Sequence, residues 1–285
     1  MAGKLIGVIG GSGFYNMDGF EVLEEKRVST PFGEPSDAII IGKLSGRKVA
    51  FLPRHGVGHR LSPSAINYRA NICALKMLGC EWVVSVSAVG SLKEDIRPGE
   101  LVIVDQFIDR TKFRAQTFFE GGIVAHVAFG DPVCKELAKT LHDSAKSLGV
   151  KVHKGGTYVC MEGPAFSTRA ESRLHKSWGA DLIGMTNMPE AKLAREAELC
   201  YATIALSTDY DCWKEEGHVD VGEIIAILKQ NVANAQRVLK DVVAKIPLDR
   251  KCACANALAG AIMTDSKLVP KETKKKLEPI AGRYF

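Results

Sequence analysis

The sequence predicts a single α/β domain built on a mixed central β-sheet that is flanked by helices. Short apolar runs of strand length alternate along the 285 residues with longer segments that have the period of amphipathic helices. A content of 46% hydrophobic and 25% charged residues is enough for a large core, and no composition break marks a linker. We therefore expect one domain over residues 1–285, with a helical C-terminal extension that begins near residue 250.

Apolar runs, helical periods and turn residues predict the individual elements. Strands are expected at residues 4–9, 37–44, 47–52, 82–86, 101–104, 152–161, 182–184 and 200–206. Helices are expected at residues 63–78, 132–148, 167–178, 189–198 and 221–243, with further helical structure at 256–276. Ser45 and Gly46 predict a hairpin turn, Ser62 the N-cap of the first helix and Gly79 its end, and residues 111–129 are expected to be irregular.

A glycine-rich turn follows the first strand. Glycines at 10, 11 and 13 let backbone amides approach an anion closely, and Ser12 adds a hydroxyl donor. Asn16 replaces the third glycine of the dinucleotide-binding pattern, and no Gly-Lys-Ser/Thr follows, so neither a dinucleotide site nor a P-loop is expected. The turn is either an anion contact or a plain tight turn.

Arg54 and His55 stand at the end of a strand in a glycine-rich loop, where they could bind a phosphate through charge-assisted hydrogen bonds. His55 and His59 have the spacing of a helical metal pair, but the two glycines between them argue against a helix, so we expect no metal there. Ser87 and Thr186 also follow strand-like runs. Together these residues predict an anion site shared by several strand ends.

Two carboxylates follow the most apolar strand. Asp209 and Asp211 come after the run at 200–206, and alternation along an extended chain places them on one side, with Tyr210 on the other. Two such carboxylates repel, so one of them is expected to hold a proton near neutrality. The pair could then accept hydrogen bonds from a nitrogen base and donate a proton to it. The alternative is an acidic loop that caps the next element.

Composition restricts the partners. The net charge of +5 suits a small anionic substrate, and no basic stripe is interleaved with aromatic residues, so we expect no nucleic acid. The four lysines within residues 271–276 are typical of a solvated helix face. No apolar run has membrane-spanning length and no secretory signal is evident, so we expect a cytoplasmic protein that binds no membrane.

The eight cysteines are too few for a disulfide-dense secreted fold. Cys252 and Cys254 form a C-x-C pair near the C-terminus. A zinc site would need two more ligands close by, and no paired Cys or His motif supplies them, so we expect no metal. The pair is either a disulfide or redox pair, or two unrelated thiols. Four others are expected to be ordinary core residues: Cys73, Cys80, Cys160 and Cys212.

Ten ordered motifs resemble those of the trimeric nucleoside phosphorylases, and most closely the methylthioadenosine phosphorylases. They lie at residues 10–13, 30–37, 53–56, 67–71, 88–92, 105–111, 161–171, 178–181, 184–190 and 207–213. The resemblance extends from residue 5 to about residue 245 and leaves the segment with Cys252 and Cys254 unmatched. It implies the nucleoside phosphorylase fold, an assembly of three subunits or of two such trimers, and no metal or organic cofactor.

The same resemblance implies phosphorolysis of methylthioadenosine to adenine and 5-methylthioribose 1-phosphate, a reaction of purine and methionine salvage, with inorganic phosphate as co-substrate. It assigns phosphate to Ser12, Arg54, His55, Ser87, Ala88 and Thr186. It assigns adenine to Phe166, Ser167, Asp209 and Asp211, the ribose to Met185, the methylthio pocket to Val221 and Ile224, and the 5′ end of a neighbouring subunit's substrate to His126. Asp209 is our choice for the general acid at adenine N7, which requires a raised pKa, and Asp211 would accept from the exocyclic amine.

Other functions stay open. A purine nucleoside phosphorylase that prefers 6-oxopurines is disfavoured by Asp rather than Asn at position 209, and a broad-specificity enzyme is harder to separate. A nucleosidase that uses water is disfavoured by Arg54 and His55. The broken glycine pattern disfavours a dinucleotide-dependent oxidoreductase, and a nucleoside sensor without activity would use the same pocket.

Overall fold

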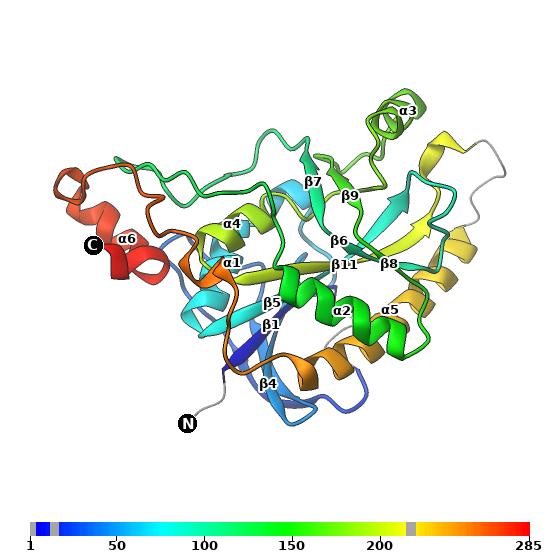
Figure 1. The fold of residues 1–285 in the computed structure, drawn as a ribbon, viewed down its shortest axis with the longest axis horizontal. Coiled ribbons are helices and arrows are strands. Elements are labelled where there is room, and N and C mark those ends of the chain that lie inside the picture. The colour runs from blue at the N-terminus through cyan, green and yellow to red at the C-terminus, as the bar shows by residue number, and fades with distance from the viewer. Residues whose placement is uncertain (1–3, 12–16, 215–220) are drawn as a thin grey trace.

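The computed structural model describes residues 4–11, 17–214 and 221–285, and its centre is a mixed sheet with helices on both faces (Figure 1). Helices α2 (Lys135–Ser147) and α5 (Val221–Lys245) lie side by side on one face. Helices α1 (Tyr68–Met77) and α4 (Glu190–Glu196) pack together on the other face. The predicted α/β class is therefore confirmed.

The sheet contains eleven described strands and branches at its longest strand. The strands are β1 (Leu5–Gly10), β2 (Glu21–Lys26), β3 (Ile39–Leu44), β4 (Arg47–Pro53), β5 (Cys80–Ser91), β6 (Leu101–Val104), β7 (Gln106–Asp109), β8 (Val152–Lys154), β9 (Thr157–Cys160), β10 (Leu182–Gly184) and β11 (Cys200–Asp209). The order β2-β3-β4-β1 leads to β5, from which one branch continues through β10, β9 and β7 and the other through β11, β6 and β8. Parallel and antiparallel pairs are mixed, as predicted.

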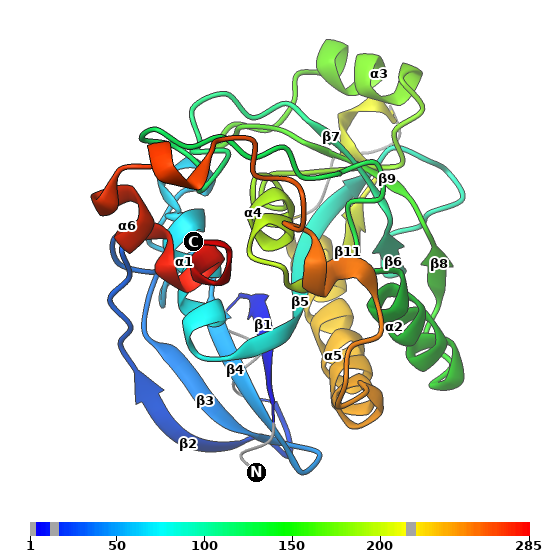
Figure 2. The ribbon, with the colours of Figure 1, turned by 60° about the vertical axis from the view of Figure 1, so that its left-hand side comes forward.

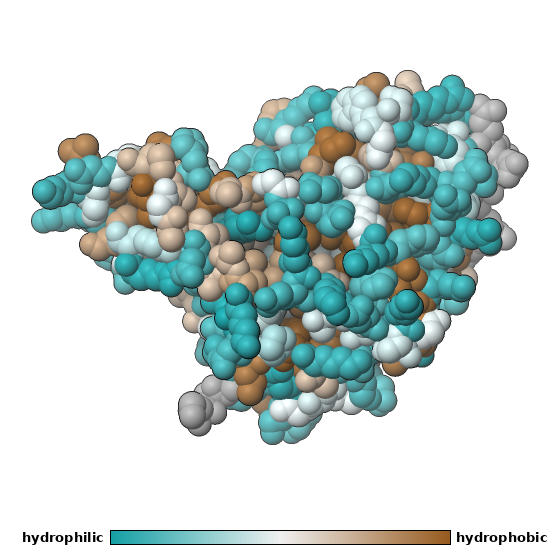
Figure 3. Space-filling model, in the orientation of Figure 1, coloured by the Kyte–Doolittle hydropathy of each residue, from teal (hydrophilic) through white to brown (hydrophobic). Residues whose placement is uncertain are grey.

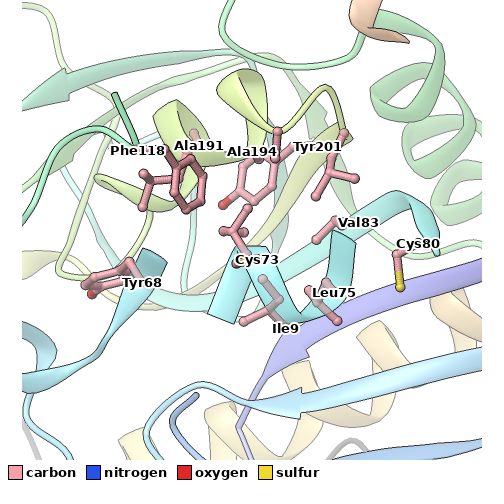
Figure 4. Close-up of a cluster of buried hydrophobic side chains, with 14 of the residues drawn as sticks. Ile9, Tyr68, Cys73, Leu75, Cys80, Val83, Phe118, Ala191, Ala194 and Tyr201 are labelled. Atoms are coloured by element: carbon pink, nitrogen blue, oxygen red, sulfur yellow. The ribbon is translucent and has the colours of Figure 1, made fainter. Parts of the chain in front are cut away.

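Two hydrophobic clusters fill the two faces because side chains alternate along each strand. In β1, Ile6 and Val8 face the α2 and α5 side, whereas Leu5 and Ile9 face the α1 and α4 side. Figure 4 shows the cluster on the α1 and α4 side, in which Tyr201 of β11 packs among residues of these two helices. Strands β1 and β11 are buried on both faces, which explains their continuous apolar runs.

Local sequence patterns correctly predicted where several elements end or turn. The predicted hairpin joins β3 and β4, and its turn residues Ser45 and Gly46 both have positive φ, 50° and 75°, as a two-residue hairpin turn requires. Helix α3 (Arg169–Ser177), expected at residues 167–178, begins with a capping box between Thr168 and Glu171. Gly79, with φ of 83°, ends the turn after α1 as predicted.

Other boundaries were wrong. The first helix begins at Tyr68 instead of residue 63, because residues 63–65 form a separate 3₁₀ turn and Ile66 is extended. The cap is Asn67, which accepts a hydrogen bond from the Ala70 N–H, and not Ser62. The strand expected at 152–161 is two strands, β8 and β9, separated by Gly155 with φ of 82°. Strands β5 and β11 are longer than predicted because their mutual pairing continues to the Asp209–Gly90 pair.

The C-terminal extension consists of short 3₁₀ turns and the helix α6 (Lys271–Ala281), which protrudes at the left of Figure 1. Glu198 fastens it to the domain by accepting hydrogen bonds from Leu258 N and from the Tyr284 hydroxyl at 3.1 and 2.6 Å. Arg283 adds an ion pair to the same carboxylate at 2.8 Å. Among the described residues, no helix is both long and apolar enough to cross a membrane.

Candidate active site

The candidate residues gather at the carboxyl edge of four adjacent parallel strands. These strands lie in the order β4, β1, β5 and β11. Arg54 follows β4, Ser87 lies in the last part of β5, and Asp209 ends β11. Ligands of open α/β sheets bind outside this edge. The topology therefore brings the predicted anion residues and the predicted carboxylates to one edge of the sheet.

Two predicted phosphate hydroxyls share one hydrogen-bonded group. Ser87 Oγ lies 2.9 Å from Thr186 Oγ1, and both side chains are buried, whereas Ala88 is exposed. The hydroxyl of Tyr158, which the sequence did not single out, lies 3.4 Å from Ser87 Oγ and accepts from the Thr186 N–H at 3.4 Å. Burial raises the pKa of Tyr158 to about 12, so its hydroxyl stays protonated. The group can therefore present neutral donors to an anion.

Arg54 is buried, and most of its N–H groups already donate hydrogen bonds to other residues of the chain. Its Nε and Nη2 donate to the two carboxylate oxygens of Glu190 at 2.8 and 3.0 Å. Its Nη2 also donates to Ser85 Oγ at 2.6 Å and its Nη1 to the Val86 carbonyl at 2.8 Å. A guanidinium has five N–H groups, so these bonds leave one, on Nη1. Glu190, another residue that the sequence did not single out, thus fixes the orientation of Arg54.

His55 is held in its neutral form. Burial is the largest of the effects that lower its pKa to about 4, and the neighbouring Arg54 and His59 lower it further. Its Nδ1 lies 2.8 Å from the Leu61 carbonyl, which can only accept, so Nδ1 carries the proton and donates. The other nitrogen, Nε2, is then an acceptor at neutral pH. His55 is therefore suited to a protonated phosphate oxygen and supplies no positive charge.

Asp209 and Asp211 are brought together, but by a turn and not by continued strand alternation. Strand β11 ends at Asp209, and Asp211 has a φ of 46° and begins a 3₁₀ turn. The Asp211 N–H donates to Asp209 Oδ1 at 2.8 Å, and Thr208 Oγ1 lies 2.7 Å from Asp209 Oδ2. A Cβ at Gly90 would lie 3.2 Å from both Asp209 Oδ1 and Asp211 Cβ. The absence of a side chain at Gly90 therefore leaves room for both residues.

The sequence analysis required a raised pKa at Asp209, as the general acid, but the structure gives the raised pKa to Asp211. Burial is the main cause, and the negative charge of Asp209 raises the pKa of Asp211 further. Ser172 of α3 opposes this shift because its hydroxyl donates to Asp211 Oδ2. The sequence did not predict this contact, since Ser172 and Asp211 are 39 residues apart. Asp211 therefore keeps its proton to a higher pH than an ordinary aspartate does.

Of the residues expected at the base, Ser167 lies beside this pair. The Ser167 carbonyl accepts from Cys212 Sγ at 3.3 Å, beside Asp211. The side chain of Phe166 is 86% exposed. Met185, expected at the ribose, packs on Gly163, whose φ of 69° favours glycine and where a Cβ would lie 2.6 Å from Met185 Sδ and displace that side chain.

Three predicted residues lie wholly or partly outside the described structure, and a fourth is held elsewhere. Ser12 is outside the described residues, and so are the side chains of Val221 and Ile224 in the first turn of α5. His126 is exposed, and its N–H donates to the Ala261 carbonyl at 2.8 Å. The loop that carries His126 is therefore fastened to the C-terminal extension.

Arg114 is a buried residue that sequence analysis missed. Its Nη1 donates to the carbonyls of Met185 and Met188 at 2.7 and 2.6 Å, and its Nη2 donates to the Glu162 carbonyl at 2.7 Å. It thereby ties the segment after β9 to the segment after β10, which carries Thr186. Arg114 lies in the irregular stretch 111–129, where no periodic pattern marks a residue for a role.

The structure contradicts the reason for expecting no metal at Cys252 and Cys254, which was the lack of two further ligands. Cys134 and Cys200 supply the two further ligands that seemed to be missing beside Cys252 and Cys254, and the four sulfur atoms lie within 4.8 Å of one another. All four are free thiols. Sequence reasoning missed them because Cys134 and Cys252 are 118 residues apart and no local spacing links them. This group, the four-cysteine cluster, could hold a metal ion.

Comparison with known proteins identifies the family. A model of the phosphorylase superfamily matches residues 5–244. The chain belongs to this superfamily. Its mixed sheet with flanking helices is the nucleoside phosphorylase fold, as the motif resemblance implied.

Relatives within the superfamily are similar over nearly the whole chain. An S-methyl-5′-thioadenosine phosphorylase of Koribacter versatilis is 60% identical over 281 residues, which cover 98% of this chain and 96% of the relative. A protein of the same name from Geobacter sulfurreducens is 57% identical over 283 residues, 99% of each chain.

Solved structures agree with these relatives. The crystal structure of a methylthioadenosine phosphorylase from an antarctic soil metagenomic library is 49% identical, covers 98% of this chain and 99% of its own, and has a TM-score of 0.94. The methylthioadenosine phosphorylase of Schistosoma mansoni in complex with adenine is 37% identical, covers 91% of this chain and 99% of its own, and has a TM-score of 0.85.

Proposed function

We propose that this enzyme is a pentosyltransferase that cleaves S-methyl-5′-thioadenosine with inorganic phosphate to give adenine and 5-methylthioribose 1-phosphate. The observation that carries the proposal is 60% identity over nearly the whole chain to a protein named for this activity. The arrangement of hydroxyls, Arg54 and two carboxylates at one sheet edge is consistent with that reaction. The enzyme would serve purine and methionine salvage.

Phosphate would be held on the β4 and β5 side of this edge. Ser87 and Thr186 would donate hydroxyl hydrogen bonds, the neutral His55 Nε2 would accept from a protonated phosphate oxygen, and Arg54 would contribute its charge and one N–H. Ser12 and Ala88 would complete the set. Phosphate positioned in this way attacks the anomeric carbon and stabilises positive charge on the ribose as the bond to adenine breaks.

Adenine would be bound on the β11 side. As the bond breaks, the departing base gains negative charge, which a proton at N7 neutralises. Asp209 would donate that proton and Asp211 would accept from the exocyclic amine, with Phe166 and Ser167 beside the base. Because the charge of Asp209 contributes to the raised pKa of Asp211, the pair and not one residue alone would control the reaction's pH dependence. Met185 would contact the ribose, and Val221 and Ile224 the methylthio group.

We also propose that the enzyme assembles as a trimer or as a dimer of trimers, with His126 reaching the 5′ end of a neighbour's substrate. His126 is exposed, and exposed apolar side chains such as Met263 and Leu268 lie on the C-terminal extension, where Figure 3 shows hydrophobic residues next to one another. Sedimentation of an active monomer would contradict this assembly. The cytoplasmic location and the need for no cofactor stay predictions from the sequence.

The test of function is turnover of methylthioadenosine, adenosine and inosine, each with and without phosphate. We expect phosphate-dependent release of adenine from methylthioadenosine and weak turnover of inosine. Release of adenine without phosphate would indicate a nucleosidase, and equal turnover of inosine would indicate a purine nucleoside phosphorylase. Equal rates with adenosine and methylthioadenosine would indicate the broad-specificity enzyme.

A further inference from the structure

The four-cysteine cluster joins three segments that are distant in the chain. Cys134 is the residue that precedes and caps α2, Cys200 is the first residue of β11, and Cys252 and Cys254 flank the start of the 3₁₀ turn Ala253–Asn256. Figure 2 shows the orange segment after α5 lying beside β11 and α2, where these segments meet. The cluster lies where the C-terminal extension leaves the central domain.

The sulfur positions fit a single tetrahedral ion. Cys200 Sγ lies 3.2 Å from Cys252 Sγ, Cys134 Sγ lies 3.8 Å from Cys252 Sγ, and all four atoms lie within 4.8 Å of one another. Four sulfur ligands at the usual zinc distance of about 2.3 Å are about 3.8 Å apart in a tetrahedron. Small movements of the sulfur atoms would therefore bring all four into coordination.

The cluster is largely closed to water. Cys134, Cys200 and Cys254 are buried, and Cys252 is partly buried. Cys134 stands at the N-terminus of the 13-residue helix α2, whose dipole would support its thiolate once a metal ion is bound. The Cys134 N–H donates to the Tyr201 carbonyl at 2.8 Å, which holds this cysteine against the start of β11. Four sulfur ligands leave no open position for a substrate, as in structural zinc sites.

We propose that Cys134, Cys200, Cys252 and Cys254 bind one Zn²⁺ ion that fastens the C-terminal extension to the domain. On binding, the four thiols release four protons to solvent and the ion takes four thiolate ligands. The site is structural, because Cys200 and Asp209 are opposite ends of β11, about 30 Å apart at the usual rise of a strand. The inference does not depend on the proposed function.

The ion would also affect the loop that carries His126. Cys252 and Cys254 begin the extension, whose residues Ala261 and Ile262 pair with Ala125 and His126. Zinc at the cluster would fix the near end of that segment, and Glu198 would fix its later part through Leu258 and Tyr284. Loss of zinc should therefore loosen the extension before it affects the sheet edge with Asp209.

The test is metal analysis of the full chain purified under reducing conditions after growth with added zinc. We expect about one zinc per chain, four thiols that react with a thiol reagent only after chelation or denaturation, and the intense visible spectrum of tetrahedral cobalt thiolate after Co²⁺ exchange. Chelation should lower the melting temperature, and added Zn²⁺ should restore it. The Cys254→Ser variant should lose the metal, whereas Cys73→Ala, a buried cysteine of α1 outside the cluster, should keep it.

Three results would overturn the proposal. One is intact mass showing disulfides among the four cysteines in the freshly purified protein. Another is four reactive thiols with no zinc uptake on titration of the wild type, a measurement that remains valid if Cys254→Ser fails to fold. The third is stoichiometric iron in place of zinc.

Discussion

Arg54 and Glu190 form a buried ion pair in which Arg54 Nε lies 2.8 Å from Glu190 Oε2, with 3% and 0% of their side chains exposed. Such a pair need not add much net stability, because removing two charges from water costs about as much as their attraction returns. Removing one partner is different, since it leaves an unpaired charge in the interior. The pair therefore positions Arg54 at the cost of making the fold depend on Glu190.

Replacing Glu190 with glutamine should destabilise the enzyme strongly. The change leaves the Arg54 charge without its counterion, and breaking one partner of a buried pair typically costs about 3–5 kcal/mol. Chemical denaturation should show a fall in the free energy of unfolding in this range. The double variant Arg54→Met, Glu190→Leu is the matched control, because it removes both charges and should recover most of the loss.

The same double variant tests the role of Arg54 without the damage to folding. Loss of a charge-assisted hydrogen bond, worth about 1.5–3 kcal/mol, should raise the KM for phosphate roughly tenfold to a hundredfold. Steady-state kinetics with varied phosphate measures this. An unchanged phosphate KM in a folded double variant would make Arg54 a purely structural residue.

How much the sequence could predict depended on the range of the interactions. The hairpin at Ser45 and Gly46 and the start of α3 at Thr168 are decided by neighbouring residues; the hairpin was predicted, and the helix was predicted to begin at residue 167, two residues early. The pairing of Arg54 with Glu190 spans 136 residues, and only the sheet topology brings the two together. No local pattern encodes such a contact. Tyr158, Arg114 and the four-cysteine cluster were missed for the same reason.

Motif resemblance supplied part of what local patterns could not. It assigned Ser87 and Thr186 to one ligand, and the structure brings their hydroxyls within 2.9 Å. It did not predict that a turn at Asp211, with positive φ, would replace strand alternation. It also stopped near residue 245, so it carried no information about the extension that Glu198 holds in place.

Glu196 should make stability depend on pH. Burial raises its pKa from 4.5 to about 7, although Thr117 and the Phe118 N–H donate to it. Between these two values the folded state binds a proton that the unfolded state has lost, so the free energy of unfolding should fall as pH rises through this window. At about 1.4 kcal/mol per pKa unit, the fall is on the order of 3 kcal/mol. Denaturation at pH 5 and pH 8 would measure it.

Glu196→Gln should flatten this pH dependence, because glutamine does not ionise. The control is Glu25→Gln on the exposed strand β2, which should leave the dependence as in the wild type. His55 affects stability over an overlapping pH range, but in the opposite direction. Its pKa is lowered to about 4, so stability is lost as pH falls from about 6.5, and wild-type and variant curves must be compared as differences. An identical slope in Glu196→Gln would show that another group is responsible.

Ser172→Ala should change the pH dependence of catalysis. The Ser172 hydroxyl donates to Asp211 and favours its charged form, so its loss should raise the pKa of Asp211 further. If ionised Asp211 accepts from the adenine amine, the acidic limb of kcat/KM for methylthioadenosine should move to higher pH. Ser177→Ala, on the same helix but exposed, is the matched control. An unmoved acidic limb would separate Asp211 from the proton-dependent step.

Base selectivity tests the carboxyl pair directly. Adenine offers a donor at position 6, which ionised Asp211 can accept, whereas hypoxanthine offers an acceptor that would face the carboxylate. Unpaired buried groups cost about 1–3 kcal/mol, which corresponds to roughly tenfold to several-hundredfold preference for 6-amino substrates. Asp209→Asn should lose the proton donor and lower methylthioadenosine turnover by about 10²–10⁴-fold. It should also shift relative kcat/KM toward inosine, because an amide can donate both to N7 and to a 6-oxo group.

The measurement is kcat/KM for methylthioadenosine and inosine in the wild type and in Asp209→Asn. The structure adds one constraint on its outcome: Asp209 Oδ1 accepts from the Asp211 N–H at 2.8 Å, and an asparagine can keep this bond only by turning its oxygen toward it. Its NH₂ group would then occupy the position of Oδ2, beside the Thr208 hydroxyl. The variant should therefore fold with an unchanged melting temperature, so that a fall in rate reports chemistry. A wild type that prefers inosine, or an Asp209→Asn enzyme with normal rate and selectivity, would contradict the role assigned to Asp209.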